Sequence, residues 1–470
     1  MNILILGAGQ VGRTVAQSLA SEQNDITVVD RDAQLLQLLQ ERLDLRTVIG
    51  HAAHPLAALH VNPGPHPDVL VEAGVEEADL MLAVTNSDET NMVACQLAHL
   101  LFKTPTRLAR VRDPNYLAHP ELFSARTIPI DHIVSPERLV TQAIAHLIDQ
   151  PGCLQILDFV DGRAQLAVVR VQAGSPMAGQ PLRRLPEFVP DRVCRLVAIY
   201  RRGQVIIPGA ATVVEAPDEI FFLAAREALS YFIGAFHPSQ APYHKVLIAG
   251  GGNIGRQLAE ALTPRHRVKI LEVDAGRCRQ LVEGLDSAIC VLHGDAGDAD
   301  LLREEDIGAT DVFCAVTNDE EANIISAALA KQLGVRKTIA IVNNAGYVDL
   351  VQDTAVDIAI SPAQVTIGAI LTHIRRGDVV AVHALRRGAA EAIELTVHGT
   401  ARSSRVIDRP LTKLGLPVGT SVGIIARQGQ LLFPHHDTRL VAEDRVVLFL
   451  ADKSQIEAVE ELFHAELNFL

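Results

Sequence analysis

The sequence predicts an α/β protein in two similar halves, each with a larger parallel-sheet domain followed by a small α+β domain. An apolar run, a glycine-rich turn and an amphipathic segment occur at 2–20 and again at 245–263. Other matched segments follow in the same order in both halves, which indicates a duplication. Short β-type runs broken by Gly, Pro and Asp then complete each half, at 179–224 and 408–451.

The matched segments also set the expected domain boundaries. Residues 82–98 match 314–330, and 130–148 match 356–374 with apolar residues at helical spacing. We expect a larger domain at 1–135, a helix at 136–150, a small domain at 151–235, a linker at 236–243, and then a larger domain at 244–361, a helix at 362–376 and a small domain at 377–470.

Composition excludes several classes of protein. With 42 basic and 56 acidic residues, the net charge is −14, which argues against nonspecific nucleic-acid binding because such binding needs a basic face. No apolar run approaches the roughly 18 residues that a membrane span needs. We therefore expect no transmembrane pathway within the chain itself.

The first element is a short apolar strand followed at once by "GAGQVG". In this strand–turn–helix context Gly7 forms the tight turn, Gly9 lets the backbone approach a phosphate, and Gly12 lets helix and strand pack closely. The free amides at the helix start would bind a pyrophosphate. The second half repeats the motif at Gly250, Gly252 and Gly255. The context predicts a Rossmann-like domain in each half.

The second strand of each half ends in an acid. Asp30 follows Gly7 by 23 residues, and Glu272 follows Gly250 by 22. An acid at about this distance accepts hydrogen bonds from ribose hydroxyls and repels a 2′-phosphate, which favours NAD(H) or an adenosine nucleotide over NADP. The alternative is a solvated carboxylate at the end of a strand.

The fourth strand of each half ends in "AVTN". Thr85 and Asn86, like Thr317 and Asn318, then lie at the start of a helix. These side chains fit simple helix capping. They also fit ligand contact, because ligands lie at the carboxyl ends of such strands.

The halves differ on the fifth strand. Arg110 and Arg112 stand in the first half where Ile341 and Asn343 stand in the second. An arginine at this edge is a candidate phosphate ligand, and a surface salt bridge is the competing interpretation. We expect the first site to favour nucleotides that make more phosphate contact.

A histidine-rich stretch follows the third strand, with His51, His54, His60 and His66 within sixteen positions. Histidines can ligate metals, but no carboxylate or cysteine cluster joins them. Gly50 pairs with Gly294 at an offset of 244, whereas Thr85 pairs with Thr317 at 232, so the first half carries 12 extra residues. We expect an inserted surface loop or a lengthened helix start, and no metal site.

His51 differs from the other three histidines, because it occupies the position of Asp295 in the second half. Both residues follow the third strand, near where an adenosine would lie. We therefore expect both to belong to the nucleotide sites.

The ordered motifs resemble those of a known family. "GAGQVG", "DITVVD", "AVTNSDETNMVACQ" and "VDLVQDTAVDIAISP" are similar to the TrkA family, the cytoplasmic nucleotide-binding subunits of bacterial Trk-type potassium uptake systems. The resemblance covers essentially the whole chain. It implies two Rossmann-like regulator-of-potassium-conductance (RCK) N-domains, each followed by an RCK C-domain, with linking helices at 136–150 and 362–376.

The resemblance also implies function. It suggests a homo-oligomeric ring, a tetramer or dimer of dimers, on the cytoplasmic face of the inner membrane beneath a membrane-embedded Trk-type potassium transporter subunit. NAD(H), or ATP or ADP, would bind in the N-domains and shift the ring between states that close or open the pore. The implied ligands are Gly7, Ala8, Gly9, Gln10, Val11, Gly12, Asp30, His51, Thr85, Asn86 and Arg110 in the first half, and Gly250, Gly252, Asn253, Ile254, Gly255, Glu272, Asp295, Thr317 and Asn318 in the second.

An NAD-dependent oxidoreductase is the main alternative. It would add a proton donor beside the nicotinamide, and Asp131–His132 is the tempting pair. The second half keeps Asp357 but has Ile358 in place of the histidine. A scaffold whose nucleotide sites have degenerated is a third class.

Overall fold

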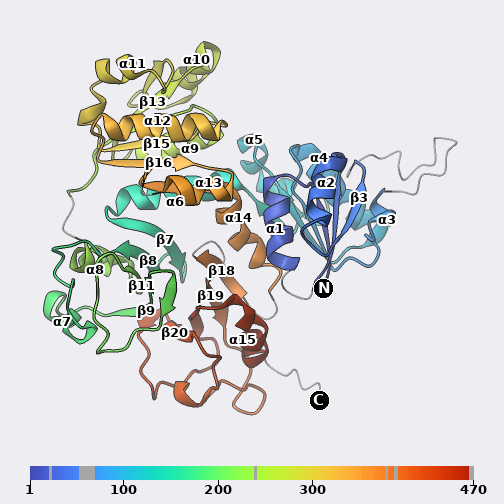
Figure 1. Ribbon diagram of the computed structural model, residues 1–470. Coiled ribbons are helices and arrows are strands. Elements are labelled where there is room, and N and C mark those ends of the chain that lie inside the picture. Colours follow the sequence, from blue (N-terminus) through green and yellow to red (C-terminus); the bar gives the residue numbers. More distant parts are fainter. Residues whose placement is uncertain are drawn as a thin grey trace. The chain divides into compact units, whose positions relative to one another are not determined.

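The computed structural model describes residues 1–20, 24–51, 69–237, 241–352, 354–375, 379–385 and 390–464 (Figure 1). The chain divides into two compact units. Unit 1 comprises Met1–Leu139 and Pro362–Ile374, and unit 2 comprises Val140–Ser361 and Arg375–Leu470.

Unit 1 contains a six-stranded sheet in the order β3-β2-β1-β4-β5-β6, with every strand pair parallel. The order reverses between β1 and β4, which is where such sheets bind ligands. The strands are β1 Asn2–Leu6, β2 Asp25–Asp30, β3 Arg46–Ile49, β4 Leu80–Ala83, β5 Thr106–Arg110 and β6 His132–Val134.

Most helices of unit 1 connect these parallel strands. A further helix, α14, comes from the second half of the chain and packs beside α1 (Figure 1). The elements are α1 Gln10–Ala20, α2 Ala33–Gln40, α3 Val69–Glu72, α4 Asp88–Leu97, the π-helical turn η1 Ala98–Phe102, α5 Pro114–Leu117, η2 Pro120–Leu122, the start of α6 Pro136–Asp149, and α14 Pro362–Leu371.

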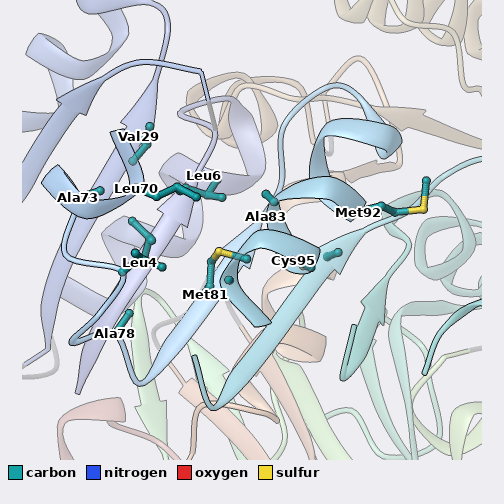
Figure 2. Close-up of a cluster of buried hydrophobic side chains, with 14 of the residues drawn as sticks. Leu4, Leu6, Val29, Leu70, Ala73, Ala78, Met81, Ala83, Met92 and Cys95 are labelled. Atoms are coloured by element: carbon teal, nitrogen blue, oxygen red, sulfur yellow. The ribbon is translucent and has the colours of Figure 1, made fainter. Parts of the chain in front are cut away.

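The core of unit 1 fixes the central strands. Leu4 and Leu6 of β1 lie with Met81 and Ala83 of β4 in a buried apolar cluster, and Cys95 of α4 belongs to the same cluster (Figure 2). Strands buried on both faces carry continuous apolar runs, as "ILIL" and "LMLA" do here. The central strands are thus packed within the core, and their carboxyl ends meet at one edge of the sheet.

Unit 2 repeats the parallel sheet, in the order β14-β13-β12-β15-β16-β17. Its strands are β12 Lys245–Ala249, β13 Arg267–Glu272, β14 Cys290–His293, β15 Val312–Ala315, β16 Lys337–Ile341 and β17 Ile358–Ile360. Its helices are α9 Asn253–Leu262, α10 Ala275–Gly284, α11 Ala299–Glu304, η5 Ile307–Ala309, α12 Glu320–Gln332 and α13 Ala345–Val351.

Unit 2 also holds two small antiparallel sheets of equivalent order, β10-β9-β11-β8-β7 and β21-β20-β22-β19-β18. The first comprises β7 Cys153–Phe159, β8 Ala164–Arg170, β9 Cys194–Arg201, β10 Gln204–Ile206 and β11 Glu219–Ala225, with η3 Leu182–Arg184, α7 Leu185–Phe188, η4 Arg226–Ala228 and α8 Leu229–Phe236. The second comprises β18 Val379–Leu385, β19 Ala390–Thr396, β20 Thr420–Arg427, β21 Gln430–Leu432 and β22 Arg445–Leu450, with η7 Leu411–Lys413, η8 Lys453–Gln455 and α15 Ile456–Phe463.

The two small sheets share one core. Phe221 of the first and Phe449 of the second belong to the same buried cluster, with ring centroids 6.2 Å apart. Glu394 of β19 is almost fully buried there, and it accepts hydrogen bonds from the Val160 amide at 2.8 Å and from Arg445 Nε at 2.5 Å. The small domains therefore pack as a pair.

The predicted fold class is confirmed, with two Rossmann-like parallel sheets and two small α+β domains in one duplicated chain. Among the residues that the structure describes, every helix is too short or too polar to span a bilayer.

Candidate nucleotide-binding sites

The first glycine of the turn after β1 packs closely against the backbone that follows β4. Gly7 has φ +110°, and its amide donates to the Val29 carbonyl at 2.8 Å. A Cβ at this position would lie 3.0 Å from the Thr85 nitrogen. Gly250 has the same role in the second half, with φ +106° and a Cβ position 3.0 Å from the Thr317 nitrogen. Both turns require glycine, because this φ strains other residues.

The third glycine of each motif permits close packing of helix on turn. A Cβ on Gly12 would lie 1.9 Å from the Gly7 carbonyl oxygen, and one on Gly255 would lie 1.8 Å from that of Gly250. No larger residue fits at either position without moving the backbone.

The middle glycine of each motif faces open space. Apart from the adjoining residues of the chain, none of the described residues places a heavy atom within 4 Å of a Cβ built on Gly9 or Gly252. Gln10 and Asn253 follow as the exposed first residues of α1 and α9, whereas Val11 is buried and Ile254 half-buried. The backbone at each helix start is thus accessible to an anion, which helix N-termini attract.

The acid at the end of the second strand holds the loop. Asp30 accepts a hydrogen bond from the Ala8 amide at 2.5 Å and another from Asp32 at 3.0 Å. Glu272 likewise accepts from the Gly251 amide at 2.7 Å and from Asp274 at 2.9 Å. A carboxylate has about four acceptor positions, so each acid can orient the loop and still accept hydrogen bonds from a ribose.

A buried asparagine, which the sequence analysis did not single out, ties the ends of β4 and β5 together. Asn91 Oδ1 accepts from the Thr85 amide at 2.9 Å and from Thr85 Oγ1 at 2.7 Å, and Asn91 Nδ2 donates to the Arg110 carbonyl at 2.9 Å. Asn323 makes the same contacts with Thr317 and with the Ile341 carbonyl. The spacing T-x5-N, present in both halves, was the available signal.

Helix capping, one of the two interpretations of the Thr-Asn pairs, is carried out by other residues in the structure. The cap of α4 is Ser87, whose side chain accepts from the Thr90 amide, and the cap of α12 is Asp319. Thr85 and Thr317 instead bind the buried asparagines, and Asn86 and Asn318 follow them as exposed residues. The helices begin two residues later than the pairs suggested, because Ser87 and Asp319 provide better-placed acceptors.

Arg110 and Arg112 both form ion pairs, and neither is a simple surface salt bridge. Arg110 Nη2 lies 2.9 Å from Glu137 Oε1 in the first turn of α6, with the two side chains only 20% and 12% exposed. Arg112 Nε lies 3.2 Å from Oδ1 of the buried Asp88. The Arg110 backbone nevertheless lies at the same sheet edge as the glycine loop, through the Asn91 network.

His51 and Asp295 follow equivalent strands, β3 and β14. A Cβ on Gly50 would lie 2.6 Å from a Val69 methyl carbon, and one on Gly294 would lie 2.3 Å from a Leu301 methyl carbon. These contacts are 19 residues apart in the first half (69 minus 50) and 7 in the second (301 minus 294), which locates the 12-residue insertion between Gly50 and Val69.

His51 itself is half-buried, and the Asp295 carboxylate accepts from the Gly297 amide at 2.8 Å. The expected loop, with His54, His60 and His66, lies outside the described residues. In the part of the chain that is described, no three His, Cys, Asp or Glu side chains group as metal ligands.

The Asp131–His132 pair lies at the wrong edge for hydride chemistry. Asp131 immediately precedes β6 and accepts from the Arg107 amide at 2.8 Å, so it belongs to the amino-terminal edge of the sheet. Asp357 does the same for Thr338 in the second half. The glycine loop is at the carboxyl-terminal edge, at least one strand length away, about 10 Å. A proton donor beside a bound nicotinamide is therefore not provided by this pair.

Known proteins match both the domains and the whole chain. The TrkA-N domain family model matches residues 3–136 and 246–362, and the TrkA-C domain model matches 166–237. The Trk system potassium uptake protein TrkA of Halomonas elongata is 50% identical over 469 residues, and that of Vibrio alginolyticus is 46% identical over 471, with 100% of each chain covered.

A solved GsuK channel bound to NAD shares the fold, with a TM-score of 0.60 at 20% identity over 98% of this chain and 79% of that one. The domain matches and the full-length relatives agree on one assignment, and the chain belongs to the TrkA family.

Proposed function

We propose that this chain is the nucleotide-binding regulatory subunit of a potassium uptake transporter, with a nucleotide site in each larger domain. The two glycine turns carry the proposal: each has a first glycine at positive φ, a middle glycine that faces open space, and an acid that accepts a hydrogen bond from a loop amide. The full-length relatives named as Trk system potassium uptake proteins support it.

The proposed ligands are NAD(H) and, at the same sites, ATP or ADP. Loop amides at the starts of α1 and α9 would hold the phosphates, and Asp30 and Glu272 would accept from the ribose. The GsuK structure that shares the fold is bound to NAD. Thr85 and Thr317, at the switch point of each sheet, would border the ligand.

The proposed partners are further copies of this chain, in a ring, and a membrane-embedded potassium transporter on whose cytoplasmic face the ring sits. Nucleotide binding would alter transport by favouring one of two ring states, which requires a different affinity for each. The role is regulatory rather than enzymatic: at each site the residues we identify bind or orient a nucleotide.

Blocking each site tests the function. Gly9→Asp and Gly252→Asp add a side chain and a negative charge to space that is open in the protein, so they should exclude phosphate without disturbing packing. We expect the double variant to fold and assemble but to lose nucleotide control of potassium uptake in cells that lack their own TrkA-type regulator. Uptake with normal nucleotide response would contradict the proposal, as would rapid NADH turnover with a carbonyl substrate.

A further inference from the structure

The ion pair between Arg110 and Glu137 joins the first nucleotide site to α6. Arg110 is the last residue of β5, and its carbonyl accepts from Asn91, which also holds Thr85 beside the glycine loop. Glu137 is the second residue of α6, whose later residues belong to unit 2. The pair therefore connects the sheet edge, through Arg110, to the first turn of α6, through Glu137.

This pair is incompletely satisfied. Only one contact joins the two groups, from Arg110 Nη2 to Glu137 Oε1 at 2.9 Å. Arg110 Nε and Glu137 Oε2 are both buried and have no hydrogen-bond partner among the described residues. A buried guanidinium and carboxylate normally use more of their donors and acceptors, so this arrangement leaves capacity for another charged group.

The second half shows that the domain does not need the pair to fold. At the equivalent positions it has Ile341 for Arg110 and Ala363 for Glu137, and both are buried. The two charges are thus replaced together by apolar groups. Buried ion pairs are weak evidence for stability, because apolar replacement is often neutral or stabilising. The pair in the first half is better explained by a binding role.

We propose that Glu137 is a specificity-determining residue of the first site. Its carboxylate pairs with Arg110 until the outer phosphate of a nucleoside triphosphate takes the place of that carboxylate. This inference rests on the proposed nucleotide site. β5 is two strands from β1, or about 10 Å. A pyrophosphate held by the loop amides would therefore be distant from Arg110, and a terminal phosphate that extended toward β5 would approach it. Displacement frees Glu137, and with it the first turn of α6.

Calorimetry on the full chain tests the proposal, with Gly252→Asp as background so that only the first site is titrated. Glu137→Gln removes the competing charge and should strengthen ATP binding by about tenfold, the size of one charged hydrogen bond. NADH has no terminal phosphate, and its affinity should change less than about twofold. Arg110→Ala should abolish the gain in ATP affinity. The protein that carries both Arg110→Ala and Glu137→Gln should bind ATP no better than the protein that carries Arg110→Ala without Glu137→Gln.

Glu121→Gln is the matched control, because it removes the same charge from an exposed glutamate of unit 1 that pairs with His119. It should leave both affinities unchanged. Equal strengthening of ATP and NADH by Glu137→Gln, no strengthening of either, or a gain that survives Arg110→Ala would each overturn the inference. Failure of both ligands to bind the Gly252→Asp protein would instead refute the first nucleotide site itself.

Discussion

Replacing Asn91 with alanine should loosen the edge of the sheet on which the first site is built. Asn91 is fully buried, and its side chain satisfies the Thr85 amide and hydroxyl and the Arg110 carbonyl. Alanine leaves the amide and the carbonyl without these partners. Each buried group that loses its partner costs about 1–3 kcal/mol. We therefore expect the β4–β5 edge to lose about 3 kcal/mol of stability against local opening.

Hydrogen exchange followed by mass spectrometry measures this loss. A cost of about 3 kcal/mol corresponds to roughly 100-fold faster exchange in peptides covering β4 and β5. Asn323→Ala is the matched control, since it should accelerate β15 and β16 and leave unit 1 unchanged. Exchange that is less than about fivefold faster in Asn91→Ala would show that the Asn91 hydrogen bonds do not stabilise the β4–β5 edge.

Three further predictions concern other parts of the chain. Burial, and then the stacked His132 ring 3.5 Å away, lower the pKa of His373 from 6.5 to about 4, so the folded state favours the neutral ring and loses stability as pH falls from about 6.5 toward 4. Full burial would give about 3 kcal/mol, and partial solvation reduces this to roughly 1–2; the melting temperature should thus fall more between pH 7.5 and 5 in the wild type than in His373→Leu, and an equal fall would contradict this. Asp30→Asn should weaken NADH binding at the first site about tenfold and narrow its preference over NADPH, because it removes a charged acceptor; unchanged affinities in calorimetry would exclude the ribose contact. Glu394→Gln should lower the melting temperature by the loss of about 2 kcal/mol, while Glu443→Gln, at an exposed position, should not; equal melting temperatures would show that the buried carboxylate is dispensable.

Much of the architecture could be predicted because it depends on local patterns. The roles of Gly7 in the turn and Gly12 in helix packing follow from a motif of six residues, and its repetition revealed the duplication. The equivalence of Gly50 and Gly294 likewise located the insertion. Periodic burial and glycine geometry depend on residues that are close together in the sequence, so the sequence alone can predict them.

The features that could not be predicted depend on contacts between distant residues. Arg110 pairs with Glu137 across 27 positions, from the end of one strand to the start of a helix. Asn91 could be seen as a repeated residue, but its contact with β5 requires the parallel pairing of β4 with β5. The sequence left helix capping open for the Thr-Asn pairs because several neighbouring side chains could cap α4, and only the backbone geometry selects Ser87.

The most direct test of the two-site account is calorimetry of the full chain with NADH and ATP, comparing the wild type with Gly9→Asp, Gly252→Asp and the double variant. We expect two sites per chain in the wild type, the loss of one site in each single variant, and the loss of both in the double variant, with unaltered melting temperatures. Nucleotide binding that persists in the double variant would contradict it, because the ligand would then bind elsewhere than on the two glycine turns.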